Sequence, residues 1–264
     1  MSGMGQEASG YGDGLFYRTS LAQAFSEAWE RLWMKTLRIL PPIEGVQTQN
    51  SNGFASGRTP EEALRAARGE LIERAVFLTA WNNRDGWSST SEKGLRNHIL
   101  TACLAHLGWR TSLYRLREAR LGDVICGLAT QTRGGAIFGS CYRHPEMNLA
   151  SAQSKALRSM LRTAVALDKM PDRYAPLPEN GGPESHRDFY MKPEHLEAFA
   201  FLNTLPKPPT KIELGAYDDT IAQVLIDIEG FPYVAAATNP CWPRPDWGRG
   251  SIVPGGNPWP HPLA

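Results

Sequence analysis

Residues 51–75, SNGFASGRTPEEALRAARGELIERA, join a turn rich in glycine and serine to a strong helix start. Thr59 is a residue type that caps helix N-termini, Pro60 suits the first helical turn, and Glu62 stands three residues after the cap. The pattern therefore predicts a helix that begins at Thr59 and continues to about Leu78.

One face of this helix carries charge among small and apolar residues. At 100° per residue, Glu70 and Arg74 share a stripe with alanines and Phe77, and Glu73 lies beside them. Two carboxylates three residues apart can hold a divalent cation that binds phosphate oxygens, and an arginine one turn later can bind a phosphate directly. Alternatively, Glu70 and Arg74 form an ordinary ion pair that supports the helix by about 0.3–0.5 kcal/mol.

The turn before the helix offers hydroxyl and backbone N–H groups. Ser51, Asn52 and Ser56 are placed to bind an anion, although such stretches are also common as plain turns. These three residues are therefore candidates for cofactor binding, with Glu70 and Glu73 as the candidate metal ligands.

The remaining chain predicts a mixed α+β fold in a single domain, residues 15–264, after a flexible tail over residues 1–14. Apolar periodicity and turn signals place the other elements. We expect helices from Ser20 past Trp33, over 92–107, 149–168 and 194–203, strands over 109–116, 124–130, 136–141, 223–228 and 233–237, and a loop over 171–192.

Composition excludes several classes of function. The 264 residues carry 28 basic and 27 acidic side chains, so the chain lacks the basic excess of proteins that bind nucleic acid or anionic membranes. No apolar run approaches the roughly 20 residues of a membrane span, and the first residues lack an export signal pattern. Four widely spaced cysteines form no zinc motif. We expect a cytoplasmic protein with no membrane or nucleic-acid partner.

The charged helix and the chain end together resemble one family. Residues 51–75 resemble the hallmark segment of the YcaO superfamily, whose E-x-x-E-R signature falls on Glu70, Glu73 and Arg74. Residues 135–162 are similar to the strand and helix of the family's second nucleotide-binding signature. The prolines Pro258, Pro260 and Pro262 match the terminal P-x-P-x-P of the members that form azolines.

The resemblance implies a YcaO-like α+β domain that uses ATP and Mg²⁺ on a peptide backbone. In this family, a Cys, Ser or Thr side chain or an external sulfide attacks an amide carbonyl of a ribosomally made precursor peptide. ATP then phosphorylates the amide oxygen, and its departure as phosphate leaves an azoline, a thioamide or an amidine. The resemblance makes Glu70, Glu73, Arg74 and the three terminal prolines catalytic candidates. It adds to the cofactor-binding candidates four residues of the second signature, namely Lys155, Arg158, Ser159 and Arg162. Candidate partners are a precursor peptide, a protein that recognises or activates it, and a second copy of the chain.

The sequence also departs from the family pattern. Ala67 stands where the first signature has serine, Ser159 where the second has glutamate, and Arg162 where glutamine is usual. Fewer carboxylates favour direct neutralisation of phosphate by arginine over magnesium coordination. Two alternatives therefore stay open: a scaffold subunit that no longer turns over ATP, and an α+β binding protein outside the family. For an active enzyme, we expect deletion of the last five residues to abolish activity without unfolding the chain.

Overall fold

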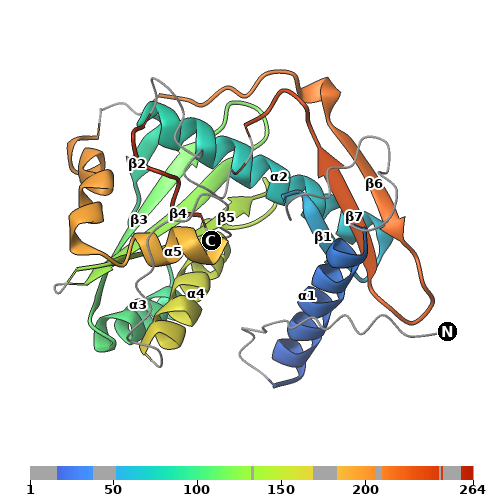
Figure 1. Cartoon of the computed structure of the whole chain (residues 1–264), viewed down its shortest axis with the longest axis horizontal. Coiled ribbons are helices and arrows are strands. Elements are labelled where there is room, and N and C mark those ends of the chain that lie inside the picture. Colours follow the sequence, from blue (N-terminus) through green and yellow to red (C-terminus); the bar gives the residue numbers. More distant parts are fainter. Residues whose placement is uncertain are drawn as a thin grey trace. The chain divides into compact units, whose positions relative to one another are not determined.

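The computed structural model describes residues 17–37, 52–131, 134–168, 183–205, 210–243, 245 and 257–263 (Figure 1). The chain divides into two compact units. The first contains residues 1–72 and 215–242, and the second contains residues 73–214 and 243–264. The helix α2 (Pro60–Asn83) contributes its first half to one unit and its second half to the other.

The first unit is built on a three-stranded antiparallel sheet. Its strand order is β1 (Phe54–Gly57), β7 (Tyr233–Thr238) and β6 (Ile221–Ile226). A short helix, η2 (Tyr217–Asp219), precedes β6. At the start of β1, Gly53 adopts a φ of 74°, and its carbonyl accepts the Ala237 N–H at 2.8 Å.

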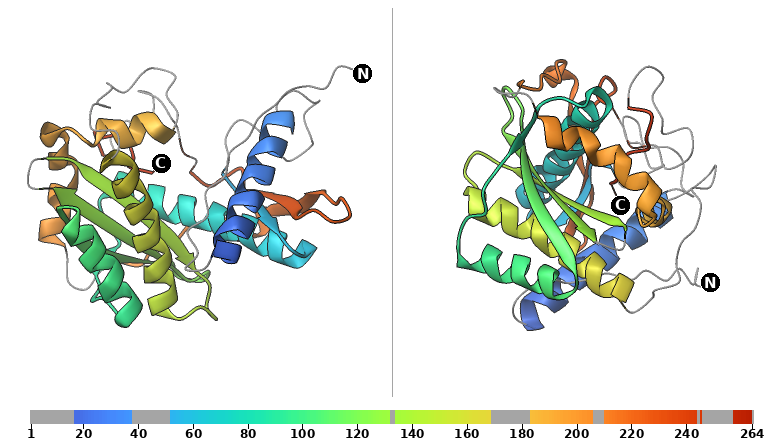
Figure 2. Two further views of the ribbon diagram at one scale, coloured as in Figure 1. Left: turned by 90° about the horizontal axis from the view of Figure 1, so that it is seen from below. Right: turned by 90° about the vertical axis from the view of Figure 1, so that its left-hand side faces the viewer.

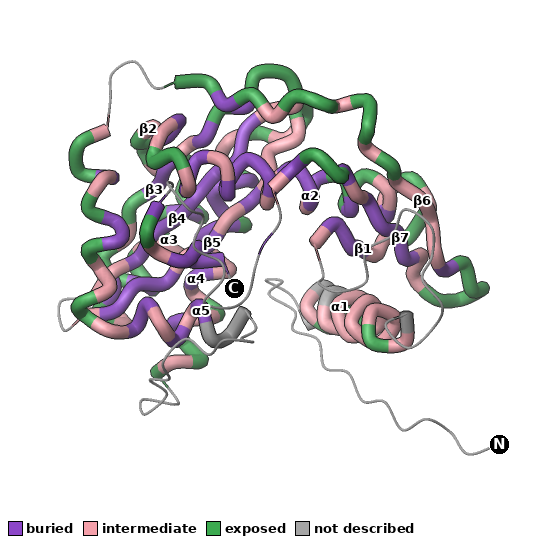
Figure 3. Tube along the Cα trace, turned by 45° about the horizontal axis from the view of Figure 1, so that its top comes forward, coloured by how far each residue is buried: buried purple, intermediate pink, exposed green. Residues whose placement is uncertain are grey.

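The helix α1 (Tyr17–Leu37) packs on this sheet through tryptophans. Trp29 stacks on Phe231 with ring centroids 4.4 Å apart and donates its indole N–H to the Pro232 carbonyl at 2.9 Å. No α1 side chain that the structure describes is fully buried (Figure 3). A few aromatic contacts and hydrogen bonds therefore hold α1 on the sheet.

The second unit has a four-stranded antiparallel sheet. Its order follows the sequence: β2 (Trp87–Ser89), β3 (Trp109–Arg117), β4 (Asp123–Gln131) and β5 (Ala136–Arg143). The helices α3 (Leu95–His106) and α4 (Leu149–Asp168) lie side by side on one face of this sheet (Figure 2). Their buried leucines meet Trp109, Ile137 and Met160 in one core.

The second half of α2 packs against the other face. The Phe77 ring contacts Phe138 of β5 at 4.8 Å and Trp87 at 5.7 Å, and Trp81 continues the aromatic layer. The short helices α5 (Pro183–Phe189) and η1 (Pro193–Thr204) add Tyr190, just after α5, and Phe199 to this layer.

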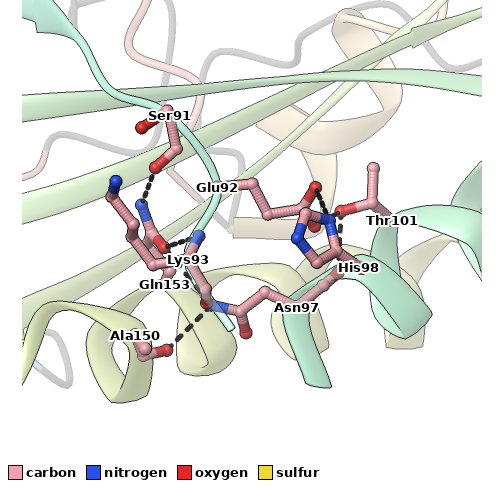
Figure 4. A network of polar contacts seen from close by, with 8 residues as sticks. All are labelled: Ser91, Glu92, Lys93, Asn97, His98, Thr101, Ala150 and Gln153. Atoms are coloured by element: carbon pink, nitrogen blue, oxygen red, sulfur yellow. Dashed lines mark hydrogen bonds and ion pairs between the residues drawn. The ribbon is translucent and has the colours of Figure 1, made fainter. Parts of the chain in front are cut away.

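A buried amide network joins α3 to α4 (Figure 4). The Asn97 side-chain amide donates to the Lys93 and Ala150 carbonyls at 2.7 and 3.0 Å. The Gln153 side chain accepts the Lys93 N–H and donates to the Ser91 carbonyl, both at 2.9 Å. The bonds to Ser91 and Lys93 pair backbone groups ahead of α3, and the bond to Ala150 links α3 to α4.

The α+β class and most elements agree with the sequence-based predictions. The predicted helix over 149–168 is confirmed at both ends, and α2 continues five residues past the predicted end. The first helix was predicted to begin at Ser20, but it already begins at Tyr17, so that boundary is wrong. The strands β1 and β2 were missed, and α5 lies within the predicted loop. The predicted tail over residues 1–14 lies outside the described residues.

Among the helices that the structure describes, none combines the length and apolar character that a membrane span requires.

Candidate functional site

The start of α2 forms as the sequence predicts. The Thr59 hydroxyl accepts the Glu62 N–H at 3.2 Å, which is the bond of an N-cap. The Glu62 carboxylate reaches back to the Arg58 N–H at 3.1 Å, one residue before the cap. This carboxylate also pairs with the Arg58 guanidinium, and both effects lower the pKa of Glu62. The two caps fix the residue at which the charged helix begins.

In the turn before α2, which was predicted to bind an anion, the polar groups of Ser56 bond to α1. Ser56 donates its backbone N–H to the Glu30 carboxylate at 3.1 Å and its hydroxyl to the Ser26 carbonyl at 3.3 Å. Asn52 is half-buried in the turn that leads into β1. Ser51 lies outside the described residues. Ser56 therefore ties α1 to β1, and its place in a cofactor site stays a prediction.

Glu30 is a functional candidate that the sequence did not reveal. Burial, together with the neighbouring charge of Glu27, raises the pKa of Glu30 to about 7, although the bond from the Ser56 N–H works against this rise. Nothing in the local sequence marks this residue, because the cause is the packing of α1 on β1.

The three charged residues of α2 are half-buried. Glu70 belongs to the first unit, and Glu73 and Arg74 belong to the second. Ala67, which replaces the family's serine, is fully buried in the helix's packed face. The serine hydroxyl of the family pattern is therefore replaced here by an apolar contact.

The Glu73 carboxylate is held by β5. One oxygen accepts the Ser140 hydroxyl at 2.6 Å, and the other accepts the Tyr142 N–H at 2.7 Å. Two donors on two oxygens fix the orientation of the carboxylate. Each oxygen keeps a second lone pair that could accept a further bond. Ser140 is thus a supporting residue that the sequence analysis did not single out.

The residues of the second signature lie on α4. Ala152 and Ala156 are fully buried against the sheet. The charged and hydroxyl residues turn away from that core, with Lys155 and Arg162 exposed and Arg158 and Ser159 half-buried. The face that the family lines with carboxylate and amide is basic in this chain.

Charged residues of both signatures act on one thiol of β5. Burial raises the pKa of Cys141 to about 12, the charge of Glu73 adds to the rise, and the charges of Lys155 and Arg158 oppose it. The pKa of Cys141 therefore depends on the carboxylate of α2 and on the two cations of α4. Burial also raises the pKa of Cys126, so neither buried thiol acts as a nucleophile near neutral pH.

The terminal prolines are part of the packed second unit. Pro260 and Pro262 are buried, as are the neighbouring His261 and Leu263, whereas Pro258 is exposed. Removing the last five residues would therefore expose the surface on which they pack. The expectation that such a deletion leaves the fold intact stays a prediction.

The donor set fits magnesium only when phosphate oxygens complete the coordination. Among the residues that the structure describes, no three His, Cys, Asp or Glu side chains gather to hold a metal ion. Magnesium, however, commonly uses one or two carboxylates together with waters and the phosphates of a substrate. The oriented Glu73 is one such carboxylate, and Glu70, Lys155 and Arg158 stay predicted members of the site.

Comparison with known families settles the relationship. The family model described as YcaO cyclodehydratase, ATP- and Mg²⁺-binding, matches residues 32–225. The chain belongs to the YcaO family. The cofactors inferred from its sequence, ATP and Mg²⁺, are those of the family's description. The match ends before the terminal prolines, so it says nothing of their role.

Solved structures support the YcaO fold. A heterocyclase in complex with substrate and cofactor is 18% identical over 75% of this chain and 29% of its own, with a TM-score of 0.55. The E. coli microcin synthetase McbBCD complex with pro-MccB17 bound is 13% identical over 90% of this chain and 64% of its own, with a TM-score of 0.54. YcaO from Methanopyrus kandleri bound with AMPPCP and Mg²⁺ is 14% identical over 85% of this chain and 76% of its own, with a TM-score of 0.59. The chain thus spans less than two thirds of the first two of these relatives. No curated protein matches it.

Proposed function

We propose that this YcaO protein is an ATP- and Mg²⁺-dependent enzyme that activates an amide of a peptide backbone. The product is an azoline, a thioamide or an amidine in a ribosomally made peptide, and residues 15–264 act as one YcaO domain. Family membership supports ATP-dependent peptide modification in general. The observation that supports the finer proposal is the oriented Glu73 carboxylate, whose charge acts on the Cys141 thiol together with the charges of Lys155 and Arg158.

The residues of the chain have separate tasks in this proposal. Bound ATP with Mg²⁺ supplies the phosphoryl group that turns the amide oxygen into a good leaving group. Glu70 and Glu73 would hold the cation, and the two donors of β5 keep the Glu73 carboxylate oriented. Arg74, Lys155 and Arg158 neutralise the phosphate charge that grows during transfer.

The partners in this proposal are a precursor peptide, a protein that presents it, and a second copy of the chain. Support comes from two similar structures: one relative was solved with substrate and another as a multi-protein complex with pro-MccB17. The chain covers 29% of the first of these relatives and 64% of the second.

A specific observation favours a second candidate function, that of a scaffold without ATP turnover. Ser159 and Arg162 replace the glutamate and glutamine of the second signature, and both Glu73 oxygens already have a donor. A chain of this kind would keep the fold and its partner surfaces while losing the cation.

Titration with a non-hydrolysable ATP analogue and Mg²⁺ distinguishes the two functions. The enzyme proposal expects a rise in melting temperature, because ligand at a hundredfold excess over Kd adds about 2.7 kcal/mol of stability. Glu70→Gln should remove most of that rise, whereas Glu61→Gln, at an exposed position of the same helix, should keep it. No rise in the unchanged protein, with the purified chain folded, would refute the stand-alone enzyme.

A further inference from the structure

The C-terminal segment, residues 257–263, is bound to the second unit mainly by side chains that donate hydrogen bonds to its backbone carbonyls. Prolines at 258, 260 and 262 remove every second N–H group, so the segment cannot form a helix or pair fully as a strand. Its backbone offers mainly carbonyl oxygens. Three successive carbonyls, those of Trp259, Pro260 and His261, each accept a hydrogen bond from a side chain of the second unit.

These three donors come from two elements far apart in the sequence. The Trp81 indole N–H, near the end of α2, donates to the Trp259 carbonyl at 3.1 Å. The Tyr190 hydroxyl, just after α5, donates to the Pro260 carbonyl. The His186 Nδ1, within α5, lies 2.6 Å from the His261 carbonyl. A carbonyl only accepts, so Nδ1 carries the hydrogen.

The start of the segment is anchored as firmly. Asn257 donates its N–H to the Asn82 carbonyl at 2.9 Å and its side-chain amide to the Trp81 carbonyl at 3.2 Å. Its side-chain oxygen accepts from Arg84 at 3.2 Å. Asn257 is 1% exposed. Its buried side-chain amide has a partner at the nitrogen and another at the oxygen.

Aromatic rings complete the contact. The Trp259 ring lies 5.7 Å from His195 and 6.3 Å from Phe189, and the His261 ring lies 4.4 Å from His186. Aromatic rings beside indole and hydroxyl donors are the features by which proline-rich ligands are recognised in general. Here both features converge on one extended segment.

The segment is also prepared for binding by its own sequence. From Asn257 to Pro262, every residue is either a proline, with a fixed φ, or precedes one and is excluded from helical backbone. A chain so restricted loses little entropy when it is held extended. It has the properties of a preorganised peptide ligand.

We propose that Trp81, Tyr190, His186 and the aromatic rings beside them form a recognition site for an extended, proline-alternating peptide. The C-terminus of the chain is its resident ligand. The site donates hydrogen bonds to the backbone carbonyls of three consecutive residues. It requires proline at alternate positions of the peptide. A peptide of residues 257–264, NPWPHPLA, therefore binds it in trans once the covalent link is cut. This inference does not depend on the proposed enzyme activity, and its test uses no activity measurement.

The test starts from the folded full-length protein. Residues 250–255 are replaced by the target sequence of a site-specific protease, and the chain is cut after purification. A fluorescein-labelled NPWPHPLA peptide is then titrated against the cut protein and its anisotropy is recorded. We expect saturable binding that unlabelled NPWPHPLA reverses. A peptide with alanine at the three proline positions should bind about 10-fold more weakly or worse, because it regains backbone freedom.

Variants of the full chain test the donors. Tyr190→Phe removes one hydroxyl and should weaken peptide binding by about 3- to 10-fold, whereas Tyr233→Phe, on β7 in the first unit, should leave binding unchanged. If the cut protein unfolds as its terminus leaves, added peptide should restore its circular dichroism. The proposal is overturned by a folded cut protein that binds no peptide, by equal affinity for the alanine peptide, by equal affinity of the two tyrosine variants, or by an unfolded cut protein that peptide does not restore.

Discussion

Glu30→Gln should stabilise the protein above pH 7 and leave its stability unchanged below about pH 4.5. Glu30 has a pKa of about 7 in the folded protein against 4.5 for the ordinary group, mainly because burial disfavours its charge. Between these two pH values the folded state holds a proton that the unfolded state has lost. Unfolding stability therefore falls as pH rises through this window, and the loss is complete above pH 7.

The magnitude follows from the size of the shift. A difference of about 2.5 pKa units corresponds to about 3 kcal/mol, which the charged side chain costs at pH 8. Glutamine has no charge to bury and keeps an oxygen that accepts the Ser56 N–H. The substitution should therefore recover most of that energy at pH 8.

Urea unfolding between pH 4.5 and 9 measures this effect. Tryptophan fluorescence is a suitable probe because Trp29 and Trp33 of α1 pack beside the sheet that carries Ser56. Glu229→Gln, at an exposed position of the turn between β6 and β7, is the matched control and should leave the curve unchanged. A Glu30→Gln curve that runs parallel to that of the unchanged protein, or lies below it at pH 8, would refute the reasoning.

Three further outcomes are expected. Gly53→Ala and Gly108→Ala both place alanine at a φ above 70°, but only at Gly53 would the new Cβ lie 2.2 Å from a carbonyl oxygen of β7. The first should destabilise the protein clearly more in thermal unfolding, and equal losses would contradict this packing. Thr59→Ala removes the α2 cap and should cost about 0.5–2 kcal/mol in urea unfolding, whereas Thr59→Ser should cost little. A thiol reagent at pH 8 should label exposed Cys103 well before Cys141, which is buried and has a raised pKa. Mass spectrometry of the digested protein shows the order of labelling. Early labelling of Cys141 would argue against its burial.

Local signals predicted the helices and the long strands. The cap, proline and glutamate at the start of α2 are contiguous in the sequence, so the helix start could be predicted from one window. The same is true of α4, whose buried alanines and leucines recur with the helical period. In both helices, local preference and tertiary packing agree.

Short elements and shared interactions could not be predicted in this way. β1 is four residues long and exists because β7, nearly 180 residues later, pairs with it. The same limit applies to the site. The E-x-x-E-R spacing identifies Glu73, but only the fold shows that Ser140 and the Tyr142 N–H hold its carboxylate. Long-range contacts leave no periodic trace in a sequence.

The outer edge of β5 has a consequence for how the protein behaves at high concentration. An edge strand invites pairing with strands of other molecules. Here the Tyr142 N–H is occupied by Glu73, and the Ala136 N–H donates to the Tyr190 carbonyl at 2.7 Å. The same carboxylate that serves the candidate site therefore also guards the sheet against aggregation. Substitution of Glu73 would act on solubility as well as on ligand binding, and the two effects separate only when both are followed across a series of protein concentrations.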